Sequence, residues 1–270
     1  MRKFLLASAA GALFTGMATA QPLVTLADGN SEADFDLSGG GQYNWFVDGV
    51  DHLFNQDFYF RAGGMMDERS VTTTALMGHH VVDTNPFSDP RPDVLTTLYF
   101  DAATGLEFEF RYGLSGGTPG SRTADLAEQI TIRNRGQQAI DVSFFQYVDF
   151  DLAGTAGSDF GEILNGRVAQ QSDTTSGVTV TETVVTPAPS HFDIKNWPDI
   201  ISLFFDGLPT TLSDDPGPVF GDVAWAFQWN FTLVPGGSYL ISKDKLIVPA
   251  PGAVALLGFA GLAASRRRRA

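Results

Sequence analysis

The chain has 270 residues, with 31 acidic side chains (Asp and Glu) against 17 basic ones (Lys and Arg), and it contains no cysteine. Its net charge of −14 argues against nucleic-acid binding, because so acidic a protein is repelled by the phosphate backbone. The lack of cysteine excludes a thiol nucleophile, a cysteine-ligated zinc site and an iron–sulfur cluster.

Residues 1–20 have the layout of a secretory signal peptide. Arg2 and Lys3 form a basic start, residues 4–17 are mainly apolar, and Ala18-Thr19-Ala20 is the small-x-small pattern that signal peptidase cleaves. Cleavage there would leave Gln21 as the first residue of the mature protein. The alternative is a buried N-terminal helix.

Two segments early in the body carry side chains that can ligate metals. Residues 28–36 place oxygen ligands at every second position, as an EF-hand loop does, but Ala33 and Gly39 stand where that loop needs glycine and glutamate. We therefore expect a solvated segment there rather than a calcium loop. His79 and His80 would point to opposite faces of a strand, so they cannot hold one metal together.

The middle of the chain predicts strands. Residues 106–112 alternate apolar and charged side chains with period two. Residues 130–133 and 140–152 flank a short turn, which predicts a hairpin. Residues 177–185 are almost all β-branched, which suits a pleated surface.

The last part of the body predicts one short helix and two long strands. Residues 198–205 fit a two-turn helix, with Asn196 as a cap and Gly207 just past its end. Residues 222–234 alternate between two faces, and a turn then leads into a final strand over 238–248. One face of the first strand carries the large side chains Val223, Trp225, Phe227, Trp229, Phe231 and Leu233.

These elements predict an all-β fold. Strands at this spacing, separated by Gly-, Pro- and Asp-rich turns, are typical of one antiparallel β-sandwich of roughly 10–14 strands over residues 21–248. The signal peptide would precede it, and residues 249–270 would follow it as a sorting segment with a short hydrophobic helix. Residues 21–248 carry 11 basic and 31 acidic side chains, a net charge of −20 that would attract divalent cations.

The strongest candidate site lies at the end of the strand over 140–152. Tyr147, Asp149 and Asp151 would share one face, with alternate residues ~6.6–7 Å apart. Two acids side by side on one strand cannot flank a glycosidic bond, so the pair favours a metal site, with Ca²⁺ as a candidate, or a sugar contact. The alternative is that both acids cap a turn.

Two further patterns bear on function. Residues 113–117 match the G-x-S-x-G pattern of a hydrolase nucleophile, but the residues that follow cannot open the helix that the motif requires, so we expect a glycine-rich loop. Four amphipathic aromatic side chains could form a stacking platform for sugar rings if they are exposed. They are Tyr43, Trp45, Tyr147 and Trp197.

The end of the chain has three parts. Val248, Pro249, Ala250, Pro251 and Gly252 form a proline-rich motif, residues 253–264 carry no charge, and four arginines follow. The uncharged run is at or below the lower limit for a transmembrane helix. The arginines would stay cytoplasmic and stop transfer. They are Arg266, Arg267, Arg268 and Arg269.

This layout resembles the PEP-CTERM sorting signal of Gram-negative bacteria, although Ala250 stands where the name of that family has glutamate. The resemblance implies that the precursor pauses in the inner membrane and that an exosortase then cuts near the proline motif. The body would be released to the cell surface or beyond. The alternative is a plain C-terminal anchor that is never cut.

The resemblance also implies a role near an exopolysaccharide matrix. We therefore expect an exported, non-enzymatic protein that associates with exopolysaccharide, without a cofactor other than Ca²⁺. One alternative is a self-assembling surface-layer protein. The other is a secreted polysaccharide hydrolase, for which Asp149, Asp151 and Glu162 are the candidate acids.

Overall fold

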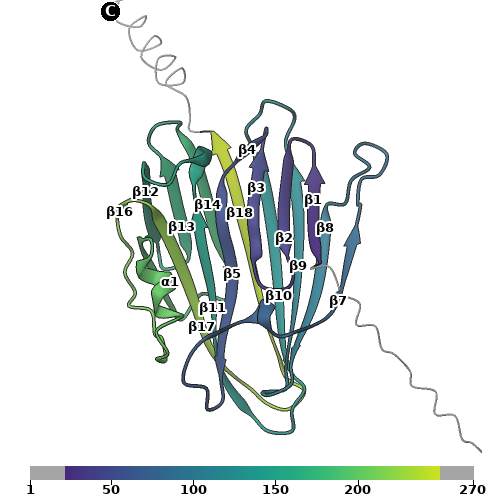
Figure 1. The fold of residues 1–270 in the computed structure, drawn as a ribbon, viewed down its shortest axis with the longest axis vertical. Helices are drawn as coiled ribbons and strands as arrows, with labels where there is room; N and C mark the ends of the chain where they lie inside the picture. The colour runs from purple at the N-terminus through teal and green to yellow at the C-terminus, as the bar shows by residue number, and fades with distance from the viewer. Residues whose placement is uncertain (1–21, 250–270) are drawn as a thin grey trace, which may run out of the picture.

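In the computed structural model, residues 22–249 are described, and they form two nine-stranded antiparallel sheets that face each other (Figure 1). The predicted β-sandwich is confirmed. The strands outnumber the expected 10–14, and three of them, β4, β6 and β16, have only two or three residues. The predicted signal peptide and the sorting segment beyond Pro249 lie outside the described residues.

The first sheet has the strand order β1-β2-β3-β5-β11-β17-β15, with β4 paired to β3 and β6 paired to β5. Its strands are β1 (Leu23–Asp28), β2 (Ser31–Asp36), β3 (Gly41–Val47), β4 (Val50–Asp51), β5 (Leu53–Ala62), β6 (Arg69–Ser70), β11 (Ile140–Phe150), β15 (His191–Asn196) and β17 (Val223–Leu233).

The second sheet has the order β16-β12-β13-β14-β18-β10-β9-β8-β7. Its strands are β7 (Ala75–Val82), β8 (Val94–Asp101), β9 (Leu106–Gly116), β10 (Ala124–Asn134), β12 (Asp159–Leu164), β13 (Val168–Asp173), β14 (Val178–Thr186), β16 (Val219–Gly221) and β18 (Ser238–Pro249).

Within residues 22–249, helical structure is limited to three short segments, η1 (Val71–Thr73), η2 (Leu152–Gly154) and α1 (Asp199–Leu203). The predicted helix over 198–205 is therefore present, but the expected cap is wrong. Asn196 ends β15, and Pro198 occupies the position before α1 without a side-chain capping bond. Among residues 22–249, no helix has the length and apolar character needed to cross a membrane.

The main core fills the space between the sheets, where the alternation of β17 places Val223, Trp225, Phe227 and Trp229. A second cluster covers the outer face of the first sheet, because α1 and the loop after it pack there (Figure 1). Its buried members are Tyr59, Phe145, Tyr147, Ile200, Phe204, Leu212, Ala224 and Ala226. The middle strands of the first sheet are thus buried on both faces.

The predicted hairpin between residues 130–133 and 140–152 is wrong. β10 lies in the second sheet and β11 in the first, so the connection crosses from one sheet to the other. Asn134 holds this crossing, because its side-chain amide donates to the carbonyls of Gln138 at 2.7 Å and Leu233 at 2.9 Å. Alternation identifies a buried face, but it does not say which strands lie alongside.

The segment 28–36 is also ordered differently from the prediction. It is neither a solvated segment nor a calcium loop, because Asp28 pairs with Ser31 across the tight turn between β1 and β2, where Gly29 has a φ of +54°. The Asp28 carboxylate accepts hydrogen bonds from the side chain of Asn85 and from the backbone of Gly116.

The structure also shows where the G-x-S-x-G pattern and the adjacent histidines lie. Ser115 lies within β9 and not in a nucleophile turn. His79 and His80 are both exposed on β7, at the edge of the second sheet.

Candidate functional site

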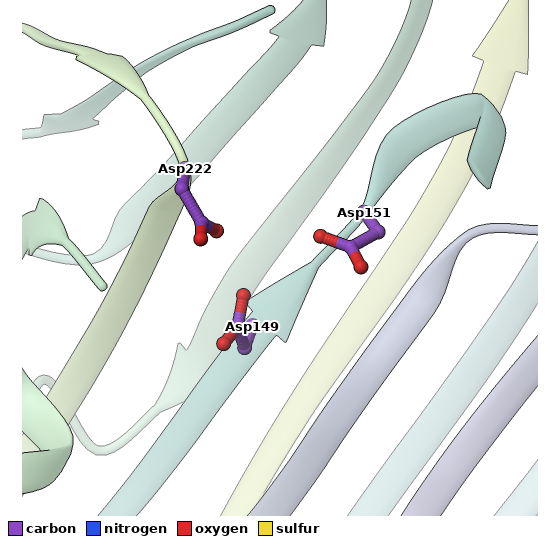
Figure 2. A group of neighbouring side chains, drawn as sticks. All are labelled: Asp149, Asp151 and Asp222. Carbon is purple, nitrogen blue, oxygen red and sulfur yellow. The ribbon is translucent and has the colours of Figure 1, made fainter. Parts of the chain in front are cut away.

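Three carboxylates meet at one end of the first sheet. Asp149, Asp151 and Asp222 each contribute an oxygen atom, and these atoms lie within 4.8 Å of one another. Figure 2 shows the three side chains turned toward a common space. They line a pocket of about 180 Å³, which we call the acidic pocket, together with Phe54, Ala156 and Trp197.

The strand order brings these acids together. Asp149 lies near the end of β11, opposite Ala224 of β17, so Asp222, just before β17, comes close to it. The register of β11 with β5 shifts between Asp149 and Phe150, so that Phe54 of β5 is left out of the pairing at this end of the sheet. Asp151 then follows the last residue of β11 and precedes η2.

Asp149 is the buried member of the group, with only 2% of its surface exposed. Its Oδ2 accepts a hydrogen bond from the Tyr147 hydroxyl at 2.9 Å. Its Oδ1 has no hydrogen-bond partner among residues 22–249. A buried carboxylate oxygen without a partner is costly, so Oδ1 is the atom in the pocket best placed to take a proton, a cation or a ligand hydroxyl.

Burial and the neighbouring acids make these groups hard to ionise together. Burial, with smaller contributions from Asp222 and Asp151, raises the pKa of Asp149 to about 7, against the opposing hydrogen bond from Tyr147. Burial, Asp222 and Asp51 also raise the pKa of Asp151, and burial raises that of Asp222. Carboxyls that share a site in this way can exchange protons near neutral pH.

Two exposed aromatic side chains border the acids. Trp197 is 51% exposed, and its backbone N–H donates to the Asp222 carbonyl at 2.7 Å, which ties it to the pocket. Phe54, near the start of β5, is 59% exposed. An apolar ring beside polar groups suits the flat face of a sugar ring.

The predicted site residues differ in their position and exposure in the structure. The fold brings Asp149 and Asp151 together, while Tyr147 is buried behind Asp149 and supports it. Of the four predicted platform residues, Trp45 and Tyr147 are buried, Tyr43 is half-buried and Trp197 is exposed.

Glu162 is not part of the group. Sequence reasoning missed Asp222, because only the pairing of β11 with β17 places it beside Asp149. The signal that could have found it is the position of Asp222 directly before a strand whose apolar face matches that of residues 140–150.

A larger pocket of about 460 Å³ lies near η2, but its one histidine is already engaged. The Nδ1 atom of His52 accepts the Ala153 N–H at 3.0 Å, and burial lowers the pKa of His52 to about 4. The wall of this pocket is formed by Val47, Asp48, Val50, His52, Gly120, Arg122, Ala153, Ser176 and Val178. We therefore take the acidic pocket as the candidate site.

No protein-family model matches the chain, and no curated protein has a similar sequence. Solved structures share the fold. A galactose mutarotase-like protein from Lactobacillus casei is 9% identical, with a TM-score of 0.50 over 84% of this chain and 100% of that one. A galactose mutarotase related enzyme from Lactobacillus acidophilus is 9% identical, with a TM-score of 0.51 over 83% and 96%.

A bacterial glucoamylase, solved with acarbose, is 6% identical with a TM-score of 0.55, covering 92% of this chain but only 36% of the glucoamylase. At these identities the likeness shows the fold alone. It contradicts the prediction that the protein is not an enzyme, because this sandwich recurs in enzymes of carbohydrate chemistry. A role connected with sugars is consistent with the fold.

Proposed function

We propose that the protein is an exported carbohydrate-active enzyme whose acidic pocket exchanges protons at the anomeric centre of a sugar. The observation that carries this proposal is the buried Asp149 carboxyl, which faces two further carboxyls beside exposed aromatic side chains. The shared fold with mutarotase-like proteins supports the same chemistry.

Interconversion of sugar anomers needs a proton donor at the ring oxygen and a proton acceptor at the C1 hydroxyl. Both must reach one small region of the substrate. Asp149, with its pKa raised to about 7, is suited to hold and donate a proton, and Asp151 or Asp222 is suited to accept one. Trp197 would lie against the face of the sugar ring.

The spacing of the carboxylates favours this reaction over hydrolysis. Retaining glycosidases hold their two carboxyls about 5–5.5 Å apart and inverting ones about 6.5–9.5 Å apart, so that a bond can lie between them. The three oxygen atoms in the acidic pocket all lie within 4.8 Å of one another, which is closer than either spacing.

The proposal of export comes from the sequence. Signal peptidase would remove residues 1–20, and an exosortase would act on the segment that resembles a PEP-CTERM signal. The enzyme would then work at the cell surface or outside the cell, where sugars of the exopolysaccharide are the natural class of substrate.

The experiment follows the anomeric proton signals of freshly dissolved aldoses by NMR, with the purified protein and two variants. Asp149→Asn should reduce the accelerated exchange by about 10²-fold or more, the usual contribution of a positioned acid. Asp67→Asn, at an exposed position, is the matched control. The proposal fails if the protein accelerates no aldose, or if Asp149→Asn exchanges anomers as fast as the wild type.

One observation favours a second candidate function, a sugar contact bridged by Ca²⁺. Asp149, Asp151 and Asp222 offer three hard oxygen ligands, and Asp149 Oδ1 has no other partner among the described residues. A cation and a proton compete for the same oxygen atoms, so the two functions respond oppositely to calcium. Calcium should inhibit anomer exchange, whereas a bridged contact would need calcium and disappear with a chelator.

A further inference from the structure

A group of six polar side chains lies in the centre of the sandwich, away from the acidic pocket. We call it the interior network. Its members come from both sheets and all are buried. They are Gln56 of β5, Gln146 of β11, Glu128 of β10, Glu182 of β14, and Lys243 and Lys245 of β18.

The charges of the interior network balance. Lys243 contacts Glu128 closely and lies 3.1 Å from Glu182 Oε1, while Lys245 contacts Glu128 closely. Two buried ammonium groups therefore face two buried carboxylates. Such groups are rarely buried unless they are paired, so their arrangement is specific.

The side-chain amide of Gln56 is held by three members of the network. Its Oε1 accepts hydrogen bonds from Lys245 Nζ and, at 3.1 Å, from Gln146 Nε2. Its Nε2 donates to Glu128 Oε1 at 3.0 Å. The same Glu128 oxygen contacts Lys245 Nζ. An amine, a polarised amide and a shared carboxylate thus meet in a site without water access.

We propose that Lys245 and Gln56 join in an intramolecular isopeptide bond, which links β18 of one sheet to β5 of the other. The bond would connect positions 189 residues apart in a chain that has no cysteine for a disulfide. This modification goes beyond the proposed function and does not depend on it.

The reaction balances within the network. Glu128 takes a proton from the Lys245 ammonium, and the neutral amine attacks Cδ of Gln56, where a new C–N bond forms. The negative charge that develops on Gln56 Oε1 is stabilised by the N–H of Gln146. The bond from Cδ to Nε2 then breaks, Nε2 takes the second proton lost by Nζ, and ammonia leaves. Glu128 remains protonated, so the network stays neutral.

Electrostatics in the core supports these roles. Burial lowers the pKa of Lys245, which favours the nucleophilic amine. Burial opposes the ionisation of Glu128, but Lys243 and Lys245 hold its pKa below the usual range, so it starts as the carboxylate that accepts a proton. Lys243 contacts only carboxylates among these polar groups, and an anionic carboxylate resists attack by an amine.

Intact mass spectrometry of the exported protein tests the proposal directly. The expected mass is lower than that of the sequence by one ammonia. Since an N-terminal Gln21 can also lose ammonia by cyclising, the loss must be located by tandem mass spectrometry of a protease digest. A linked peptide pair that contains Gln56 and Lys245 is the expected result. Separate, unmodified peptides for both residues would overturn the proposal, as would a loss of water instead of ammonia.

Two variants and a labelling experiment separate the reaction from folding. Lys245→Arg keeps the charge but cannot form the bond, and Glu128→Gln removes the proton relay, so both should retain the full mass at this site. Lys195→Arg, on the partly exposed β15, should lose ammonia as the wild type does. Lysine acetylation of the denatured wild type should leave Lys245 unlabelled, and a labelled Lys245 would contradict the bond without any variant.

Discussion

Replacing Asp149 by asparagine should stabilise the protein at alkaline pH while it removes activity. The pKa of Asp149 is raised to about 7, mainly by burial, so ionising this side chain costs folding free energy. The shift from the ordinary value of 3.8 corresponds to about 4 kcal/mol once both states are ionised. Asparagine keeps the shape and an oxygen acceptor for Tyr147, but it carries no charge.

The gain depends on pH with a definite sign. A carboxyl whose pKa is raised by folding contributes its full stability below the unfolded value and loses it as pH rises through about 7. We therefore expect Asp149→Asn to raise the free energy of unfolding by about 2–4 kcal/mol at pH 8.5, and by almost nothing at pH 4.

The assay is urea unfolding followed by tryptophan fluorescence at both pH values, in the presence of a chelator so that no cation occupies the acids. Asp67→Asn, at an exposed position, should change the free energy of unfolding by less than about 0.5 kcal/mol. An Asp149→Asn variant that is less stable than the wild type at pH 8.5 would contradict the stated cost of ionising Asp149. It would show that the Asp149 carboxylate is well satisfied in the folded protein.

Three further outcomes are expected. Burial raises the pKa of Asp57 and of Asp159 to about 7, as it does for Asp149, so the free energy of unfolding should fall by about 2.4 kcal/mol between pH 6.5 and pH 8. The melting temperature should fall over the same range, and a flat profile would contradict this. Trp197→Ala should weaken sugar binding about tenfold, measured by calorimetry. The melting temperature should not change, because the ring is half exposed, and an unchanged affinity would place the sugar elsewhere. Lys243→Ala should lower the free energy of unfolding in urea by about 3–5 kcal/mol, because it leaves the buried Glu182 carboxylate without its lysine partner. A loss below about 1 kcal/mol would show that the other groups of the network rearrange to compensate.

The sequence predicted the elements of the fold better than their neighbours. The alternation of Val223, Trp225, Phe227 and Trp229 correctly identified the core face of β17, because only one face of that strand meets the other sheet. The hairpin over 130–152 was wrong because strands that are adjacent in sequence can belong to different sheets of a sandwich. Local pattern carries no information on that choice.

The acidic pocket was half predictable. Asp149 and Asp151 lie on one strand end, so their proximity followed from the period of a strand. Asp222 lies 71 positions beyond Asp151 in the chain. It comes close to Asp149 and Asp151 only through the pairing of β11 with β17. Exposure was the other missing quantity, because Trp45 and Trp197 are alike in sequence but one is buried and the other is not.

The sequence did not predict the interior network. The polar segment Ser242-Lys243-Asp244-Lys245 predicts an exposed stretch, since lysine is seldom buried. The period of two nevertheless runs from Ile241 through both lysines to Ile247, and all four side chains face the core. What the sequence did not show is the pair of glutamates on β10 and β14 that makes this burial tolerable.

Sugar binding in the acidic pocket can be tested with a crystal structure of the protein grown with a sugar, first galactose and then oligosaccharides from the exopolysaccharide. We expect a sugar in the acidic pocket, with its ring against Trp197 and its anomeric hydroxyl within hydrogen-bond distance of Asp149. A sugar bound only in the larger pocket beside His52, with the acidic pocket empty of sugar, would contradict it.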